Sequence, residues 1–109
     1  MADETLPPGT HLIEIVEQPG NKLGPKSGQR REPVRHNESV FIKGAQGLRI
    51  SFDGEVPFVG RQVSYNQVLK VPADQKPGVY PYSCTLERPG QPPLHTDGGG
   101  EIEILDVQG

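Results

Sequence analysis

G-V-Y-P-Y-S-C, residues 78–84, is the stretch of this 109-residue chain that decides its fold. In an extended strand, Tyr80, Tyr82 and Cys84 lie on one face and Val79 lies on the other. Pro81 cannot donate a ladder hydrogen bond, which predicts an unpaired or irregular side of the strand at that residue. We therefore expect a strand that ends at the only cysteine of the chain.

The residues after Cys84 predict a loop and then a closing strand. Pro89-Gly90 and Pro92-Pro93 exclude a helix and indicate an extended loop over residues 88–100. Three glycines at 98–100 end this loop, and we expect them to act as a flexible hinge. The sequence E-I-E-I at 101–104 alternates in polarity, as a half-buried antiparallel strand does.

Short apolar segments continue through the rest of the chain. Residues 11–17, 39–43, 48–52, 56–59 and 63–71 each predict a strand, which with the two above gives about seven. No segment keeps a 3.6-residue period, while 14 Gly and 12 Pro supply turns at close spacing. The chain is long enough to bury one core, so we expect residues 1–109 to form a single all-β domain, a Greek-key sandwich.

A polar stretch at residues 18–37 has too few apolar residues to predict an element, and we interpret it as an insertion. It carries five cations against Glu32 alone: Lys22, Lys26, Arg30, Arg31 and Arg35. These candidate partner-binding residues suit an acidic protein face or a phosphorylated ligand, although the same charges also suit a solvated insertion. No aromatic residue lies among them, which disfavours nucleic-acid binding by base stacking.

The overall composition limits which classes of partner and which cellular compartment we expect. A formal net charge of -3 and a pI near 5.5 give no general attraction to nucleic acid or to an anionic membrane. No apolar run reaches the length of a membrane span, and no secretory signal is seen at the start. A single cysteine fits a reducing compartment, so we expect a small soluble cytoplasmic domain, or a periplasmic or secreted one if a signal was removed. The oligomeric state is not indicated.

The Gly-x-Tyr-x-Tyr-x-Cys strand, followed by a loop with a histidine and a last short strand, resembles the C-terminal end of cupredoxins, the blue-copper protein family. This resemblance implies a cupredoxin-like sandwich in which Cys84 and His95 are the candidate metal ligands. An immunoglobulin-like sandwich is the alternative, because Tyr82 and Cys84 also fit a tyrosine corner. The chain has no second cysteine and no tryptophan, however, and this favours the cupredoxin-like fold.

The copper ligands that the resemblance implies are largely missing. A blue-copper site needs two imidazoles, one thiolate and a weak axial ligand. Leu48 stands where the family's first histidine is expected, and the histidine that should lie near Glu87 is instead His95. The only methionine is Met1, so the usual axial ligand has no candidate. We therefore expect no cofactor, with copper as the alternative.

These observations favour a non-enzymatic binding or structural module whose partner is another protein. Its candidate contact surfaces are the Pro/Gly loop at 88–100 and the basic residues of 18–37. The alternative is a divergent copper protein for electron transfer or copper handling that uses Cys84 and His95. An enzyme with Cys84 as nucleophile is disfavoured, because no neighbouring base is indicated by the sequence.

Overall fold

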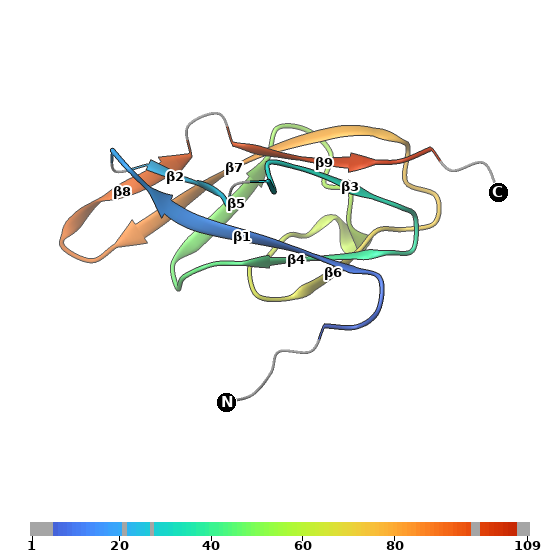
Figure 1. Ribbon diagram of the computed structural model, residues 1–109, viewed down its shortest axis with the longest axis horizontal. Coiled ribbons are helices and arrows are strands. Elements are labelled where there is room, and N and C mark those ends of the chain that lie inside the picture. Colours follow the sequence, from blue (N-terminus) through green and yellow to red (C-terminus); the bar gives the residue numbers. More distant parts are fainter. Residues whose placement is uncertain (1–5, 21, 27, 97–98, 107–109) are drawn as a thin grey trace.

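The computed structural model describes residues 6–20, 22–26, 28–96 and 99–106 (Figure 1). The regular structure of these residues consists of strands and one 3₁₀ turn, which confirms the predicted all-β class. The elements are β1 (Thr10–Gln18), β2 (Lys22–Pro25), β3 (Arg31–Val34), β4 (Ser39–Lys43), β5 (Leu48–Phe52), η1 (Val59–Arg61), β6 (Val68–Lys70), β7 (Gly78–Arg88), β8 (Gln91–Thr96) and β9 (Gly100–Ile104). No helix in this described part is long and apolar enough to cross a membrane.

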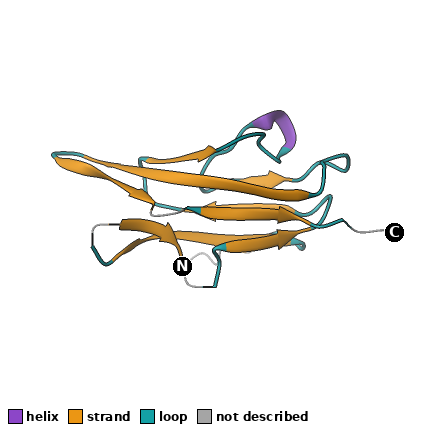
Figure 2. Cartoon of the chain, turned by 90° about the horizontal axis from the view of Figure 1, so that it is seen from above, coloured by secondary structure: helices purple, strands orange, loops and turns teal. Residues whose placement is uncertain are grey.

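Strand β1 belongs to two sheets. Its first half, residues 10–14, pairs in parallel with β4, which in turn pairs antiparallel with the short strand β6. Its second half, residues 15–18, pairs antiparallel with β2 in the other sheet. β1 therefore links the two sheets of a sandwich, whose strands run along the long axis of the molecule while η1 projects on one side (Figure 2).

Strand β7 is the central strand of the larger sheet. β5 pairs antiparallel along one of its edges, and β9 and then β8 pair antiparallel along the other. β3 and β2 complete this sheet by pairing in parallel with β9 and β8 respectively. The strand with the Gly-x-Tyr-x-Tyr-x-Cys pattern thus has hydrogen-bonded partners on both sides. Its pairing with β5 and β8 fixes the faces on which Cys84 and His95 lie.

The core lies between the two sheets because every long strand buries alternate residues. On β7 the side chains of Tyr82, Cys84 and Leu86 are buried, whereas Pro81 and Ser83 are exposed, as the period of two predicts. The buried residues of both sheets form one hydrophobic cluster. Its members from the smaller sheet are Ile13, Val40, Ile42 and Leu69, and those from β9 are Ile102 and Ile104.

Pro81 behaves as the sequence predicts. Its carbonyl accepts a hydrogen bond from the amide of Asp53 at 3.1 Å, on the side of β7 where β5 has just ended at Phe52. The nitrogen and carbonyl of one residue point to the same edge of a strand, so the missing donor faces this irregular edge. The ladder to β9 is left intact, with Pro81 in register with Glu101.

Two predicted strands differ in the structure. Residues 56–59 form no strand, because Pro57 and Phe58 are buried consecutively and cannot alternate, and the ring of Phe58 lies edge-on to Phe52 at 5.7 Å. The predicted strand 63–71 is reduced to β6. Asn66 interrupts it with a φ of 58°, and its side chain bonds the backbone of Gly44 instead.

The prediction that residues 18–37 form no element is wrong, since β2 and β3 lie within them. Each strand needs only one or two apolar anchors: Leu23 is 2% exposed and Val34 is fully buried. β2 pairs with the preceding strand β1 and with the distant strand β8, and β3 pairs with the distant strand β9. A local count of apolar residues does not detect these partners. The five basic residues are therefore carried largely by ordered sheet.

The predicted loop at 88–100 is also wrong in part, because residues 91–96 form β8. Pro89-Gly90 makes a hairpin turn in which Gly90 adopts a φ of 71°. Pro92 and Pro93 are tolerated because β2 first pairs with β8 at His95, so the start of β8 is bonded on one side only. The hairpin of β7 and β8 reaches the left end of the molecule in Figure 1.

Of the three glycines at 98–100, Gly98 lies outside the described residues, whereas Gly99 and Gly100 are described. Gly99 has a φ of 64°, and a β-carbon at Gly99 would collide with the carbonyl oxygen of Tyr82. Gly100 opens β9 and is buried. The prediction of a hinge is wrong for these two residues, which are glycines because space is lacking.

Candidate functional site

Cys84 and His95, the two candidate metal ligands, lie on opposite faces of the larger sheet. Cys84 is 2% exposed and points into the core next to Leu86. His95 is exposed, and it is the cross-strand partner of Thr85, whose side chain points away from the core. Directly paired residues share a face while successive residues alternate. The thiol and the imidazole therefore do not converge on one ion.

The environment of Cys84 disfavours thiolate chemistry. Burial raises the pKa of its thiol to about 12. A metal ligand or nucleophile needs the thiolate, which an apolar environment destabilises. The backbone amide of Cys84 is also occupied, because it donates a hydrogen bond to the hydroxyl of Thr96 at 3.2 Å. Cys84 thus acts as a small core residue, like its neighbours on β7.

The other two histidines are engaged elsewhere. His11 lies between two carboxylates, with Nδ1 at 2.9 Å from Glu32 and Nε2 at 2.8 Å from Glu38. His36 contacts the backbone carbonyl of Gln75 through Nε2 at 2.5 Å. Within residues 6–20, 22–26, 28–96 and 99–106, no three His, Cys, Asp or Glu side chains are grouped so as to hold a metal ion.

The five predicted partner-binding cations are all exposed, but their charges are partly matched by neighbours. Arg31 pairs with Glu101 at 2.7 Å across β3 and β9, and Lys26 lies 3.8 Å from Glu14. Arg35 donates its backbone amide to Glu38. Lys22 and Arg30 have partners as well. The structure does not gather these cations into one site, because they lie on β2, on β3 and on their flanking turns.

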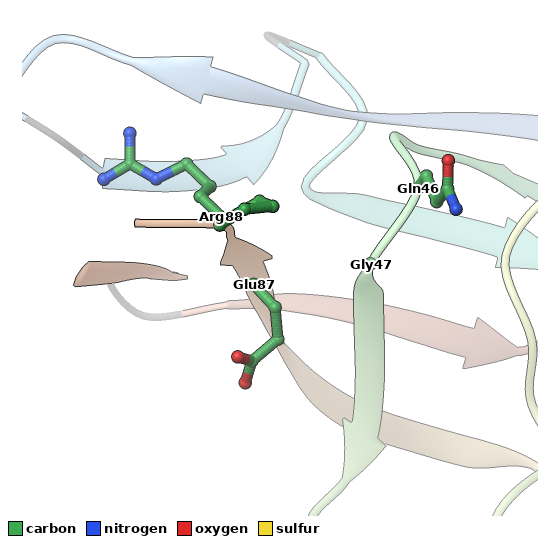
Figure 3. Close-up of a pocket in the computed structure, with 5 residues that line it drawn as sticks. Gln46, Gly47, Glu87 and Arg88 are labelled. Carbon is green, nitrogen blue, oxygen red and sulfur yellow. The ribbon is translucent and has the colours of Figure 1, made fainter. Parts of the chain in front are cut away.

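A pocket lies at the end of the β7–β8 hairpin (Figure 3). It has a volume of about 540 Å³ and is lined by Gln46, Gly47, Glu87, Arg88 and Pro89. Figure 3 shows the side chains of Glu87 and Arg88 pointing to opposite sides of the strand end, with Gln46 across from them on the β4–β5 turn. The sequence predicted contact at 88–100 but not the part played by residues 46 and 47.

Backbone contacts hold the two turns of this pocket together. The amide of Glu87 donates to the carbonyl of Gly47 at 3.3 Å, and a β-carbon at Gly47 would lie 2.9 Å from the carbonyl oxygen of Glu87. The guanidinium of Arg88 donates twice to the carbonyl of Pro92, at 2.8 and 3.2 Å. The guanidinium of Arg88 is therefore bonded within the hairpin, whereas the side chains of Glu87 and Gln46 are available to a ligand.

A second groove of smaller volume lies beside β6 in the smaller sheet. It has a volume of about 360 Å³ and is lined by Val59, Gln62, Ser64, Gln67, Val68, Leu69 and Lys70. Val59 and Val68 are 59% and 47% exposed. β6 is only three residues long and ends before Pro72, features that protect an edge strand from further pairing.

Gln75 is the one buried polar side chain among the described residues, and no local sequence pattern predicts its burial. Its amide nitrogen donates to the hydroxyl of Tyr80 at 2.9 Å and to Glu55 at 3.2 Å. Its amide oxygen accepts from Arg61 at 2.6 Å. Arg61 also pairs with Glu55 at 2.9 Å, so these side chains form a closed network that fastens the loop around η1 to β7.

Comparison with known proteins adds no assignment. The chain matches no protein-family model, and no curated protein matches it significantly.

Proposed function

We propose that this chain is a non-enzymatic protein-binding module on a cupredoxin-like scaffold, and that it works without copper. The observation that carries this proposal is the separation of Cys84 and His95 by the sheet between them. The two residues that the cupredoxin resemblance assigns to metal chemistry do not share a cavity. The pocket at the hairpin end instead brings together two turns that are far apart in the sequence.

The chemistry of this hairpin pocket supports recognition. The pocket is lined by the side chains of Gln46 and Glu87, by the guanidinium of Arg88, which is bonded to Pro92, and by the turn residues Gly47 and Pro89. Covalent catalysis needs a nucleophile within hydrogen-bond reach of a base, and no such pair lines the pocket. Exposed turns held by a rigid sheet are common places for binding residues. The pocket also includes part of the Pro/Gly stretch from which the sequence predicted partner contact.

Copper titration of the reduced protein tests the metal-free part of the proposal. Cu(I) and Cu(II) are added to the wild type and to Cys84→Ser, followed by visible absorption and paramagnetic resonance. We expect no intense thiolate-to-copper band in either protein. A stoichiometric band in the wild type that is lost in Cys84→Ser would overturn the proposal and favour the electron-transfer or copper-handling alternative.

A matched pair of substitutions tests the binding part. Gln46→Trp fills the hairpin pocket, and Gln67→Trp places the same bulk in the groove beside β6. A protein captured by the wild type is purified and titrated against both variants and against Cys84→Ser. We expect loss of affinity only in Gln46→Trp. Equal loss in Gln46→Trp and Gln67→Trp, or loss in Cys84→Ser alone, would contradict the hairpin pocket as the contact surface.

A further inference from the structure

Strand register aligns Arg49, Thr85 and His95 in one row across the outer face of the larger sheet. Arg49 on β5 is the cross-strand partner of Thr85 on β7, and Thr85 is the partner of His95 on β8. Neighbouring strands are about 4.8 Å apart, so the backbones of Arg49 and His95 lie about 5 Å from that of Thr85, one on either side. These residues are far apart in the sequence, and no local pattern indicates the row.

All three side chains of the row point to solvent. Arg49 and His95 are exposed and Thr85 is half-buried, whereas the intervening positions Cys84 and Leu86 are buried in the core. The guanidinium of Arg49 has no hydrogen bond or ion pair to the described part of the chain. Its five N–H donors are therefore available to a ligand.

The hydrogen bond between Thr85 and His95 orients the imidazole. Thr85 Oγ1 lies 3.2 Å from His95 Nδ1. When the hydroxyl donates to Nδ1, the neutral ring carries its proton on Nε2, which then faces outward as a donor. Thr85 and His95 thus form one unit, with Arg49 on the other side of the threonine.

A second row of donors lies next to the first. Ser51 on β5 pairs with Ser83 on β7, and both are exposed on the same face, two residues along from Arg49 and Thr85. We refer to Arg49, Ser51, Ser83, Thr85 and His95 as the outer-face patch. It contains no carboxylate. The hydroxyl groups of Ser51 and Ser83, the guanidinium of Arg49 and Nε2 of His95 can all donate hydrogen bonds to one acceptor-rich group.

The acidic residues of the larger sheet lie outside the outer-face patch. Glu87 is the nearest along β7, two residues beyond Thr85, and it lines the hairpin pocket. Glu101 and Glu103 lie on β9, in register with Pro81 and Val79 of β7, and Glu101 is paired with Arg31. Lys22 lies in register with His95 at the far side of the patch, but it has a partner of its own, and the patch is complete without it.

The outer-face patch is continuous with the hairpin pocket. Gly47 of the pocket is two residues before Arg49, and Glu87 of the pocket is two residues after Thr85. A segment bound in the pocket and continuing along β5 and β7 would therefore cross the patch. This continuity favours a segment of the same protein partner as the occupant.

We propose that the outer-face patch binds the oxyanions of an acidic, extended segment of the protein partner, with Arg49 and the Thr85–His95 unit as its principal donors. This inference rests on the proposed binding function and assigns the chemistry of the partner. Carboxylates accept hydrogen bonds from guanidinium, imidazole and hydroxyl groups together. A single-stranded nucleic acid fits less well, because the patch has no aromatic side chain for stacking and the chain has a formal net charge of -3.

The test measures fluorescence anisotropy with three labelled peptides of equal length, in which serine alternates with glutamate, with glutamine or with phosphoserine. We expect the glutamate peptide to bind and the glutamine peptide not to bind, with affinity falling as salt is added. Arg49→Gln and His95→Gln should each weaken binding by about two- to fivefold, the range of one exposed charge interaction or one hydrogen bond. Glu87→Gln should strengthen it by about twofold, because it removes the nearest repulsive charge.

Lys70→Gln is the matched control, since it removes one exposed charge from β6 in the other sheet. An equal loss of affinity in Lys70→Gln and Arg49→Gln would overturn the patch, and so would equal binding of the glutamate and glutamine peptides. Competition by inorganic phosphate together with tighter binding of the phosphoserine peptide would support the same donors with a phosphorylated source. Tighter binding of a single-stranded oligonucleotide than of any peptide would overturn the peptide assignment.

The two proposals fail in different ways. A purified partner that loses affinity in Gln46→Trp but binds Arg49→Gln and His95→Gln normally would overturn the oxyanion site and leave the binding function standing. Equal loss of affinity in Gln46→Trp and Gln67→Trp would overturn the hairpin pocket as the contact surface, whatever the peptides do.

Discussion

The hydroxyl of Tyr82 lies against Gly100, its cross-strand partner in β9. A β-carbon added at Gly100 would overlap the phenol oxygen and the ring of Tyr82, and would lie 2.9 Å from Cγ of Pro25. Gly100 is not in the left-handed region, so its backbone conformation is open to any residue. The absence of a side chain at this position allows β2, β7 and β9 to pack together around one buried phenol.

Gly100→Ala should therefore destabilise the fold by about 1–3 kcal/mol, the usual cost of overpacking a core. Urea unfolding followed by circular dichroism measures this change in the free energy of unfolding. Gly54→Ala is the control, because a β-carbon there meets nothing within 4 Å. An equal effect of the two substitutions would show that the contact with Tyr82 is not the cause.

Tyr82→Phe tests the same contact from the other side. The Tyr82 hydroxyl is buried and has no hydrogen-bond partner within the part of the chain that is described. Removing an unpaired buried hydroxyl should stabilise the protein by up to about 1 kcal/mol. In the double variant with Gly100→Ala, part of the alanine penalty should disappear. Strictly additive free energies of unfolding would contradict a direct clash.

Cys84 should react slowly in the folded protein. Burial raises the pKa of its thiol to about 12 from an ordinary value of 9.0, which lowers the thiolate fraction by about a thousandfold at neutral pH. Labelling with a thiol-specific disulfide reagent at pH 8 should be at least that much slower in native protein than in guanidinium chloride. Comparable rates in the two conditions would place the thiol at the surface and contradict the orientation of β7.

The stability of the fold should depend on pH through His11. Burial disfavours the charged ring, but hydrogen bonds to Glu38 and Glu32 outweigh this effect and raise the pKa of His11 above 6.5. The stabilisation is therefore complete below pH 6.5 and is lost as the pH rises through the raised pKa. The backbone amide of Arg35, followed by His11, lowers the pKa of Glu38 below 4.5, so the contribution of Glu38 is lost as the pH falls through that lowered value.

Urea unfolding from pH 4 to pH 9 should consequently show a difference between wild type and His11→Gln that is largest at pH 5–6, about 1 kcal/mol, and that fades toward pH 9. Glu32→Gln should remove only part of this pH dependence, because the hydrogen bond from His11 to Glu38 remains. Stability curves of wild type and His11→Gln that run parallel across the range would contradict the charged bridge.

Gln75→Leu should cost about 2 kcal/mol of stability, because it removes the hydrogen bonds that join Arg61, Glu55 and Tyr80 through Gln75. Gln62→Leu, in the same region but exposed, should change the free energy of unfolding by less than about 0.5 kcal/mol. Proteolysis near η1 measures whether the loop is released in the first variant only. Protection of the loop in Gln75→Leu would mean that Phe58 alone holds it.

Local alternation predicted β1, β4, β5, β7 and β9, because each buries every second side chain within its own span. It did not predict β2, β3 or β8, whose few apolar residues and several prolines disfavour a strand when considered alone. β2 pairs with the preceding strand β1, but β2 and β3 also pair with β8 and β9, which are more than 60 residues away. Local composition contains no information on such partners.

The sequence by itself determined the all-β class and the shared face of Tyr82 and Cys84, since a period of two follows from the pleat of any strand. Tertiary structure alone decided that Cys84 and His95 face opposite sides of one sheet, because this depends on the register of β7 against β8. The same register aligns Arg49, Thr85 and His95. A shift of one residue would turn each side chain to the other face, so the surface of this protein is set by pairing that no single segment encodes.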